Sequence, residues 1–447
     1  MKKTLCKQFI SLLVLISSFL LGSCDNYFHD VMGFVNEENR NSSNEDYSGP
    51  DPQRIYVGGE FSFTQDSLPH RSFAVLGPDG NLVPDFLKAD QFGITGTGKS
   101  VKTIELTDEF IYVGGDFSGY ALTIDEMTVS AGYQMIQRYS YIGDLDTSYM
   151  PASGLAQNFI NTIYPMNNGN LLIGGTFNDF TSPYLTMLDS NGTDLSAPDP
   201  ISAGGVSVNS IIATEDESLI FLGGDFSDID VKSGYENYAV LDNSGIAVPA
   251  NTLIPSITNT GINDLVLTDD GTLYIVGSNG GTGFLKKFDF NGDEFIEDSQ
   301  FETNFTNDIN PNTQFTFLST VNVDEKGMVY VGGYFKGFVD TNGSEHAGIV
   351  RLTTNGYIDP TFQLNFTGAN PTVHDIEFQR NGKILIGGLF TYVNGNMNND
   401  DSGNGILRVF RNGEVDSSFE KFAIGDGNDP GPYATVFDIA IQEVPLD

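Results

Sequence analysis

From residue 53 onward, apolar residues occur in short runs rich in β-branched and aromatic side chains, and dipeptides that favour turns separate these runs. The last full unit contains four of them within residues 372–419: TVHDIEFQ, KILIGGLF, GILRVF and EVDSSF. Asn-Gly between such runs is the strongest local signal of a β-hairpin. No segment shows the 3.6-residue apolar period of an amphipathic helix. The pattern predicts a four-stranded antiparallel meander.

One core sequence recurs along the chain, as IYVGGEF at 55–61 and IYVGGDF at 111–117, and then as LIGGTF, FLGGDF, YVGGYF and LIGGLF. A degenerate copy, LYIVGSN, occupies 273–279. The seven copies lie 49 to 60 residues apart, counted from the first glycine of each pair: Gly58, Gly114, Gly174, Gly223, Val276 in place of glycine, Gly332 and Gly387. A fixed period of this length is typical of a repeat architecture.

The two ends of the repeat region complement each other. The first copy lacks the strand that precedes the glycine core elsewhere, whereas the chain ends with TVFDIAIQ at 435–442, which matches TVHDIEFQ at 372–379. A last strand that completes the first sheet closes a ring and protects its edges. The sequence therefore predicts an all-β fold for residues 53–447: a seven-bladed β-propeller of four-stranded antiparallel blades, closed by the C-terminal strand.

Two features of each unit predict local roles. A Gly-Gly pair inside a strand indicates a bulge or a close backbone approach, and the aromatic residue that follows is expected to pack between neighbouring blades, with a ligand-stacking ring as the alternative. A column of small polar residues falls in the first strands: Thr103, Thr162, Ser210, Asp264, Thr320, Asp375 and Asp438. We expect each to bond a backbone group of the adjacent blade, and the alternative is a channel lining that binds a ligand or cation.

The last two copies resemble a known repeat. VYVGGYF followed by GIVRLTTNGYIDPTF, and ILIGGLF followed by GILRVFRNGEVDSSF, are similar to the bacterial delta-sixty repeat, which has a Val-Gly-Gly-x-Phe core, an Arg-Leu strand and an Asp-Gly-x-x-Asp-x-x-Phe ending. The resemblance spans the whole repeat region and is poorest in the fifth copy. It implies a β-propeller of secreted or surface-exposed bacterial proteins and supplies no catalytic residues.

The N-terminus has the pattern of an export signal. Lys2, Lys3 and Lys7 precede an apolar run from Phe9 to Leu21 that is too short to span a bilayer. The ending LGSC resembles the lipobox of bacterial lipoproteins, in which the peptide is cut before the cysteine and the thiol is acylated, and a plain secretory signal is the alternative. We expect a signal peptide at 1–23, then Cys24 as the lipidated residue beginning a polar flexible tether at 24–52.

Such a chain is expected at the outer membrane, held by its lipid and facing the cell surface. Cys6 would leave with the signal and Cys24 would be acylated, so no thiol remains for a disulfide, metal or catalysis. The formal net charge is -38, with 59 acidic and 21 basic residues. This balance argues against nucleic acid and against adhesion to anionic lipid. The scattered acids predict solubility and leave room for a loosely bound divalent cation; no other cofactor is expected.

Catalytic motifs do not occur in the sequence. The four histidines form no metal-binding pattern, and HExxH, GxSxG and phosphate-loop motifs are missing. The chain has no tryptophan, which excludes the sialidase-type propeller signature. Paired loop carboxylates of the kind that hydrolyse glycosides remain compatible with the pattern. The sequence predicts that the protein is not an enzyme.

Long connections point to one face of the predicted disc. Tight turns join first to second and third to fourth strands, whereas the long, varied segments join second to third strands and successive blades, and function usually resides in such loops. Aromatic and acidic residues there could stack and hydrogen-bond a sugar or a peptide, with local packing as the alternative. These candidate binding residues are Tyr120, Asp125, Asp228, Tyr235, Tyr392, Asp401, Asp429 and Tyr433.

Together these features predict a lipid-anchored cell-envelope β-propeller that acts as a binding or scaffold protein for an envelope protein partner, or for a glycan or peptide. An accessory role at an outer-membrane nutrient importer is one form of this hypothesis. The alternatives are an extracellular hydrolase or lyase that uses loop carboxylates, and an adhesive protein.

The anchor yields the first test. In Cys24→Ala the acyl acceptor is missing, so the protein should remain unacylated and appear in the soluble fraction. Metabolic labelling with a fatty acid and membrane fractionation measure both effects, and continued membrane attachment of the variant would contradict the lipobox assignment. Ser23→Ala, which keeps the cysteine, is the matched control.

Overall fold

The chain divides into two units, Met1–Glu45 and Asp46–Asp447, and all residues described below belong to the second. The computed structural model describes residues 54–65, 68–83, 86, 100–117, 135–146, 148–149, 159–177, 182–196, 207–226, 228–229, 232–233, 237–249, 253–254, 257, 261–307, 315–335, 338–340, 343–367, 371–390, 392–393, 405–419 and 434–442. The expected signal peptide, Cys24 and the tether lie outside them.

The second unit is built almost entirely of antiparallel strands. We number its repeats one to seven by the copy of the glycine core that each contains. In each repeat an inner strand pairs with a middle strand that carries the core, and the middle strand pairs with an outer strand. The inner strands are β28 (Thr435–Gln442), β3 (Ser100–Leu106), β6 (Ile160–Pro165), β9 (Ser207–Ala213), β14 (Gly261–Leu267), β18 (Phe315–Val323) and β24 (Thr372–Phe378) for repeats one to seven.

The middle strands are β1 (Arg54–Gln65), β4 (Phe110–Asp116), β7 (Leu171–Gly175), β10 (Ile220–Asp225), β15 (Thr272–Asn279), β19 (Val329–Phe335) and β25 (Ile384–Leu389). The outer strands are β2 (Leu68–Leu76), β5 (Ile136–Ser140), β8 (Leu185–Leu188), β13 (Tyr238–Leu241), β16 (Thr282–Phe290), β22 (Ile349–Leu352) and β27 (Ile406–Val409). Short additional elements are β11 (Asp228–Ile229), β12 (Lys232–Ser233), β17 (Phe295–Glu297), α3 (Ser299–Asn307), β20 (Phe338–Val339), β21 (Glu345–His346), β23 (Phe366–Thr367) and β26 (Tyr392–Val393).

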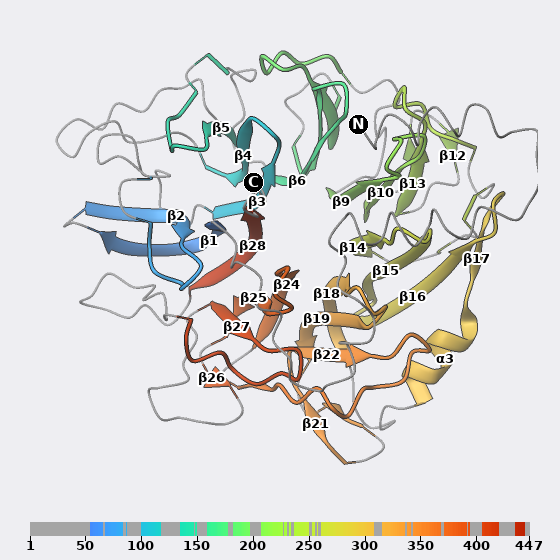
Figure 1. Cartoon of the computed structure of the whole chain (residues 1–447). Coiled ribbons are helices and arrows are strands. Elements are labelled where there is room, and N and C mark those ends of the chain that lie inside the picture. Colours follow the sequence, from blue (N-terminus) through green and yellow to red (C-terminus); the bar gives the residue numbers. More distant parts are fainter. Residues whose placement is uncertain are drawn as a thin grey trace, which may run out of the picture. The chain divides into compact units, whose positions relative to one another are not determined.

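The inner strands lie around a common centre, with the middle and outer strands radiating from it (Figure 1). Contacts run from β3 through β6, β9, β14, β18 and β24 to β28, and β28 also contacts β3. This radial arrangement of antiparallel sheets is that of a β-propeller. Among the described residues no helix has the length and apolarity needed to cross a bilayer.

The predicted pairing of the chain's last strand with the first glycine core is observed. β28 runs antiparallel to β1, with Ile55 opposite Ile441 and Val57 opposite Ile439. Val436 and Ile439 are buried in one apolar cluster with Ile55 and Val57. The first repeat is therefore assembled from the two ends of the second unit.

The two glycines of each core serve different contacts. A Cβ placed on Gly387 would come within 2.8 Å of Val436 in the inner strand of the next repeat. On Gly388 it would come within 2.2 Å of the carbonyl oxygen of Thr372, in the inner strand of the same repeat, where a β-bulge shifts the register between Val373 and Asp375. The pair thus marks both a bulge and a close approach, as the sequence predicted. The aromatic residues after the pairs are buried: Phe61, Phe117, Phe177, Phe226, Phe335 and Phe390.

The prediction of four full strands in each repeat needs correction. Repeat five has a fourth strand, β17, but in the other six the fourth run forms a single bridge in the described residues: Leu76↔Leu82, Tyr139↔Leu145, Leu188↔Asp194, Leu241↔Ala247, Leu352↔Ile358 and Val409↔Val415. In repeats two, six and seven an aspartate turn ends the pairing. In repeat seven, Oδ1 of Asp416 accepts hydrogen bonds from the main-chain N–H and the hydroxyl of Ser418, which turns the chain away from the sheet.

The same aspartate holds an arginine of the outer strand. Nε of Arg408 lies 2.8 Å from Oδ2 of Asp416, its Nη1 donates to the carbonyl oxygen of Pro78 in repeat one, and its guanidinium stands over the ring of Phe419. Repeats two and six repeat this clamp with Arg138 and Arg351, whose Nη1 atoms donate to carbonyl oxygens of the following repeats. The Arg and Asp of the repeat motif therefore join consecutive repeats.

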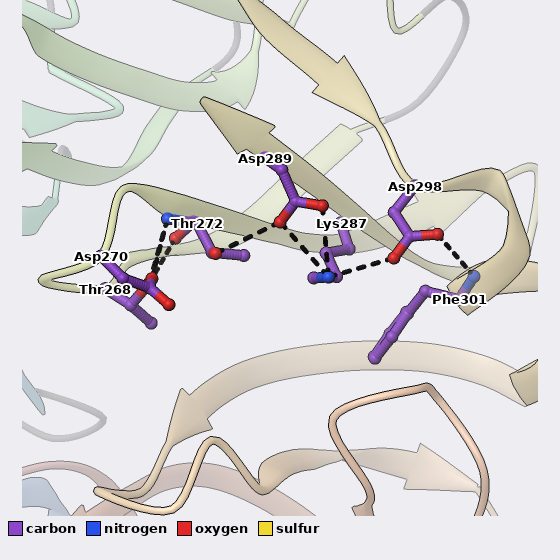
Figure 2. A network of polar contacts seen from close by, with 7 residues as sticks. All are labelled: Thr268, Asp270, Thr272, Lys287, Asp289, Asp298 and Phe301. Atoms are coloured by element: carbon purple, nitrogen blue, oxygen red, sulfur yellow. Dashed lines mark hydrogen bonds and ion pairs between the residues drawn. The ribbon is translucent and has the colours of Figure 1, made fainter. Parts of the chain in front are cut away.

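Repeat five carries a lysine in place of the arginine (Figure 2). Nζ of Lys287 lies 3.0 Å from Oδ2 of Asp298 and 3.3 Å from Oδ1 of Asp289. Oδ1 of Asp298 also accepts the main-chain N–H of Phe301 at the start of α3, so this one carboxylate binds the lysine and caps the helix.

The strand pairing of the two ends leads to a prediction. Deleting residues 435–447 removes Val436 and Ile439 from the core, and losing one such side chain alone costs about 2–5 kcal/mol. The unpaired edge of β1 should also promote association. We expect an unfolding midpoint lower by at least about 5 °C, together with oligomers in gel filtration. A deletion of 443–447, which leaves β28 intact, should have neither effect, and an unchanged midpoint in the longer deletion would contradict the closing role of β28.

Candidate functional site

Three aspartates at the centre link consecutive inner strands. Oδ2 of Asp264 accepts the main-chain N–H of Val321 at 3.0 Å, and Oδ2 of Asp375 accepts that of Ile439 at 2.7 Å. Asp438 accepts the main-chain N–H of Ile104 in the same way. Each bond runs from one repeat to the next, which confirms the predicted hydrogen bonding for these three members of the polar column.

The other four residues of the polar column do not accept a main-chain N–H of the next repeat in this way. The hydroxyls of Ser210 and Thr320 both donate to Asp264, each at 3.2 Å, so that this side chain accepts bonds from both neighbouring repeats. Thr103 is buried and Thr162 is half-buried. Five of the seven residues in the column therefore take part in links between repeats, and Asp264 makes the most of them.

A second row of links was not anticipated from the sequence. Nδ2 of Asn209 donates to the carbonyl oxygen of Ile262 at 2.8 Å, and Nδ2 of Asn263 donates to that of Leu318 at 2.6 Å. Asn161 and Ser319 make equivalent bonds to the next inner strand. The available signal was an asparagine immediately before the polar column in three consecutive repeats.

Two glutamates face the same centre from strands far apart in the sequence. Burial raises the pKa of Glu105 well above its usual range, and the charges of Asp438 and Glu377 raise it further. Burial raises the pKa of Glu377 to about 8, with additional contributions from Asp438 and Asp264. Both side chains remain partly accessible to solvent. The charge of Asp438 raises the pKa of both glutamates, so the two groups share one electrostatic environment.

The linking aspartates belong to that group. Burial raises the pKa of Asp264 to about 6 and that of Asp438 to about 7, although the N–H groups that they accept lower both values. The pKa of Asp375 lies well above its usual range because of burial and the charges of Glu377 and Asp438. Five carboxyl groups therefore share the centre, and the pKa of each is raised above its ordinary value.

Basic and aromatic groups occur one position before the polar column on three neighbouring inner strands. Nζ of Lys102 lies 3.2 Å from the ring centroid of Phe437, whose centroid is 5.0 Å from that of His374. Burial lowers the pKa of Lys102 to about 8, and burial together with the charge of Lys102 lowers that of His374 to about 4. His374 is therefore neutral under physiological conditions.

The loop residues proposed from the sequence fall largely outside the described part of the chain. Asp228 lies in β11 and Tyr392 in β26, but their side chains are not described. Tyr120, Asp125, Tyr235, Asp401, Asp429 and Tyr433 lie outside the described residues. Within the described ranges, no three His, Cys, Asp or Glu side chains are placed to hold a metal ion. The loosely bound cation stays a prediction.

Comparison with known proteins supports the fold. The family described as "Domain of unknown function (DUF5122) beta-propeller" matches residues 327–362 and 379–419, which form much of repeats six and seven. The chain contains β-propeller repeats. Among curated proteins, none matches the sequence.

Three solved structures are similar to this chain at low sequence identity. The Dos1 propeller is 9% identical, with 87% of this chain and 93% of that chain covered and a TM-score of 0.43. A protein of unknown function from Bacteroides caccae is 10% identical, with 69% and 92% covered and a TM-score of 0.36. A gluconolactonase from Xanthomonas campestris is 14% identical, with 56% and 74% covered and a TM-score of 0.34.

The central carboxyl groups predict how stability depends on pH. The folded-state pKa of Glu377, about 8, is higher than the ordinary glutamate value of 4.5, so folding is penalised increasingly as the pH rises from about 4.5 through 8. Glu377→Gln removes this penalty. We expect the variant to match the wild type at pH 4 and to unfold about 2 °C higher at pH 8.5.

Scanning calorimetry at both pH values measures this difference. Glu414→Gln, which changes an exposed turn carboxyl, is the matched control and should not alter the pH profile. Destabilisation by Glu377→Gln at pH 8.5 would show that the charged glutamate stabilises the centre, contrary to this prediction.

Proposed function

We propose that residues 53–447 form a closed seven-bladed β-propeller that is held at the outer membrane by a lipid on Cys24 and acts as a binding or scaffold protein. The seven copies of the glycine core, the pairing of β28 with β1 and the return of the inner-strand contacts to β3 support the closed ring. The LGSC motif after a short apolar run supports the anchor.

The observation that carries the binding role is the engagement of the central aspartates. Asp264, Asp375 and Asp438 accept main-chain N–H groups of the next inner strand. These side chains hold neighbouring repeats together and are therefore committed to the scaffold, which leaves the long connections as the part of the chain that can vary for binding. The turns between inner and middle strands, by contrast, are short and internally bonded, as at Asp324, whose Oδ1 accepts two main-chain N–H groups.

Partner contact therefore belongs on the long-loop face, at the candidate residues Tyr120, Asp125, Asp228, Tyr235, Tyr392, Asp401, Asp429 and Tyr433. An envelope protein such as a nutrient importer, or a glycan or peptide, is the partner class that the anchor and these aromatic and acidic loops favour. The strong negative charge makes a basic surface on the partner favourable for association.

A second candidate function is hydrolysis at the centre of the ring. Glu105 and Glu377 have raised pKa values in a partly accessible site, and groups of that kind serve as general acids in enzymes. Turnover of members of a glycan and lactone panel, abolished in Glu377→Gln, would favour this function. Saturable binding without turnover would favour the binding protein.

Capture from native envelope tests the binding role. The purified mature domain should retain a specific envelope protein, and replacing residues 392–404 with a short Gly-Ser bridge should weaken capture at least about tenfold while sparing the fold, because loop residues contribute little to the core. Mass spectrometry of the captured proteins and the thermal midpoint of the variant measure both effects.

The control is a change on the opposite face. Asn381-Gly382 replaced by Ala-Ala should lower stability, because Gly382 has a φ of 80°, while capture by the remaining folded protein stays intact. A crosslinking map that places the partner on the tight-turn face would contradict the proposal.

A further inference from the structure

Exposed apolar side chains concentrate at one kind of turn. In the part of the chain that the structure describes, seven large hydrophobic residues are exposed, and six of them lie in the turn between the third and fourth runs of a repeat or within two residues of it. Single exposed hydrophobic residues are ordinary, but their concentration in one class of turn is not. The six, called the apolar rim below, belong to the consecutive repeats two to six: Ile142, Leu195, Ile246, Phe290, Ile296 and Tyr357.

The rim lies at the tight-turn face. In an antiparallel meander the turn between the third and fourth runs emerges at the same end of the sheet as the turn between the inner and middle strands. A contact in repeat two shows this directly, because the hydroxyl of Tyr141 donates to the carbonyl oxygen of Thr107. Tyr141 follows β5, and Thr107 begins the turn that joins β3 to β4. The two kinds of turn therefore share one face.

The turns that carry the rim bond their own backbone. Oδ1 of Asp242 accepts the main-chain N–H groups of Ser244 and Ile246 at 2.9 and 3.0 Å. Oδ1 of Asp189 accepts two main-chain N–H groups in the turn before Leu195, each at 2.8 Å. Backbone groups without partners are costly next to lipid, so a turn that is bonded internally can approach the edge of a bilayer at a lower cost.

The chain enters the described structure at the same face. Arg54, the first described residue, begins β1 opposite the end of β28, and its Nη1 donates to the carbonyl oxygen of Tyr141. The next residue, Ile142, is 66% exposed, more than any other member of the rim. The tether predicted at 24–52 therefore ends beside the rim, and a flexible chain of roughly 30 residues has a mean reach of about 30 Å. A lipid on Cys24 would hold this face close to the bilayer.

We propose that the apolar rim rests on the lipid bilayer that carries the anchor, so that the tight-turn face meets the headgroups and the long-loop face points away from the membrane. This inference rests on the lipid anchor of the proposed function. The tether gives the rim an effective concentration of roughly 1 mM at the surface, so weak contact by a few side chains is enough. The orientation leaves the long-loop face free for the partner.

The charge of the chain decides which lipid surface fits the rim. Asp293 and Glu294 are exposed in the turn that carries Phe290 and Ile296. Anionic headgroups would repel these carboxylates and the formal net charge of -38. Zwitterionic headgroups offer ammonium groups to the same carboxylates. The occupant of the rim is therefore a bilayer surface of zwitterionic phospholipid.

Tryptophan fluorescence tests this orientation without background, because the chain contains no tryptophan. A protein of residues 24–447 is coupled through Cys24, its single thiol, to a maleimide lipid in phosphatidylcholine vesicles. In Ile246→Trp and Tyr357→Trp the emission should shift to the blue on coupling and should be quenched by bromine-labelled acyl chains. Side chains at a membrane interface lie about 5–10 Å into the boundary between headgroups and acyl chains, within reach of such a quencher.

Phe159→Trp is the matched control on the other face. Phe159 is 37% exposed, and its carbonyl oxygen accepts the main-chain N–H of Thr176 just beyond β7, at the end of the sheet opposite the tight turns. Its tryptophan should show neither the blue shift nor the quenching. Signals in Phe159→Trp that equal or exceed those of the rim variants would overturn the proposal.

Serine substitutions measure what the native side chains contribute. Ile142→Trp serves as the reporter, and Ile246→Ser and Tyr357→Ser are introduced together. The ratio of membrane-contacting to detached protein should fall about tenfold, because two partly buried side chains are lost. Asn81→Ser together with Phe159→Ser, which leaves the rim intact, should not change this ratio. Unchanged quenching after the two rim substitutions would contradict the proposal.

Two further measurements identify the occupant of the rim. Phosphatidylglycerol added to the vesicles should weaken the quenching, and stronger quenching would overturn the assignment of a zwitterionic surface. A blue shift that grows with protein concentration in the absence of vesicles would identify a second copy of this chain as the occupant and would overturn the proposal. Chemical coupling separates these outcomes from natural acylation: a failure of lipidation appears only in fatty-acid labelling of the native chain, and a failure of membrane contact appears only here.

Discussion

The close approach between a glycine of one middle strand and the inner strand of the next repeat is the constraint on which the rest of the structure depends. Gly58 faces Val101 and Gly387 faces Val436 at distances that leave no room for a Cβ. This contact sets how tightly neighbouring sheets pack near the centre. The aspartate, asparagine and arginine links between repeats all require that spacing, since each spans from a side chain to the backbone of the adjacent repeat.

Much of the fold could be predicted from the sequence because the same features recur along the chain. The glycine pair, the turn dipeptides and the final strand occur in fixed order, so their meaning could be deduced by comparing copies within one chain. The polar column was interpreted correctly at Asp264, Asp375 and Asp438 for the same reason. The fourth strands were overestimated, because the run EVDSSF has strand-forming residues, whereas Asp416 binds Ser418 and Arg408 and ends the pairing after one bridge.

The candidate sites could not be predicted from the sequence. Glu105 and Glu377 are separated by most of the chain, and each is ordinary in its own strand; only the ring brings their charges together. Repetition identifies what copies share, whereas a binding site depends on how one copy departs from the others.

The pairing of β28 with β1 also has a consequence for the time course of folding. The hydrogen bond between Tyr56 and Gln442 joins residues 386 positions apart, so the first sheet cannot be completed until nearly the whole chain exists. At a synthesis rate of roughly 5–20 residues per second, the edge of β1 waits about 20–80 s for its neighbour. During that interval the nascent chain presents an unpaired strand, which is the state in which a chaperone would be most useful to it.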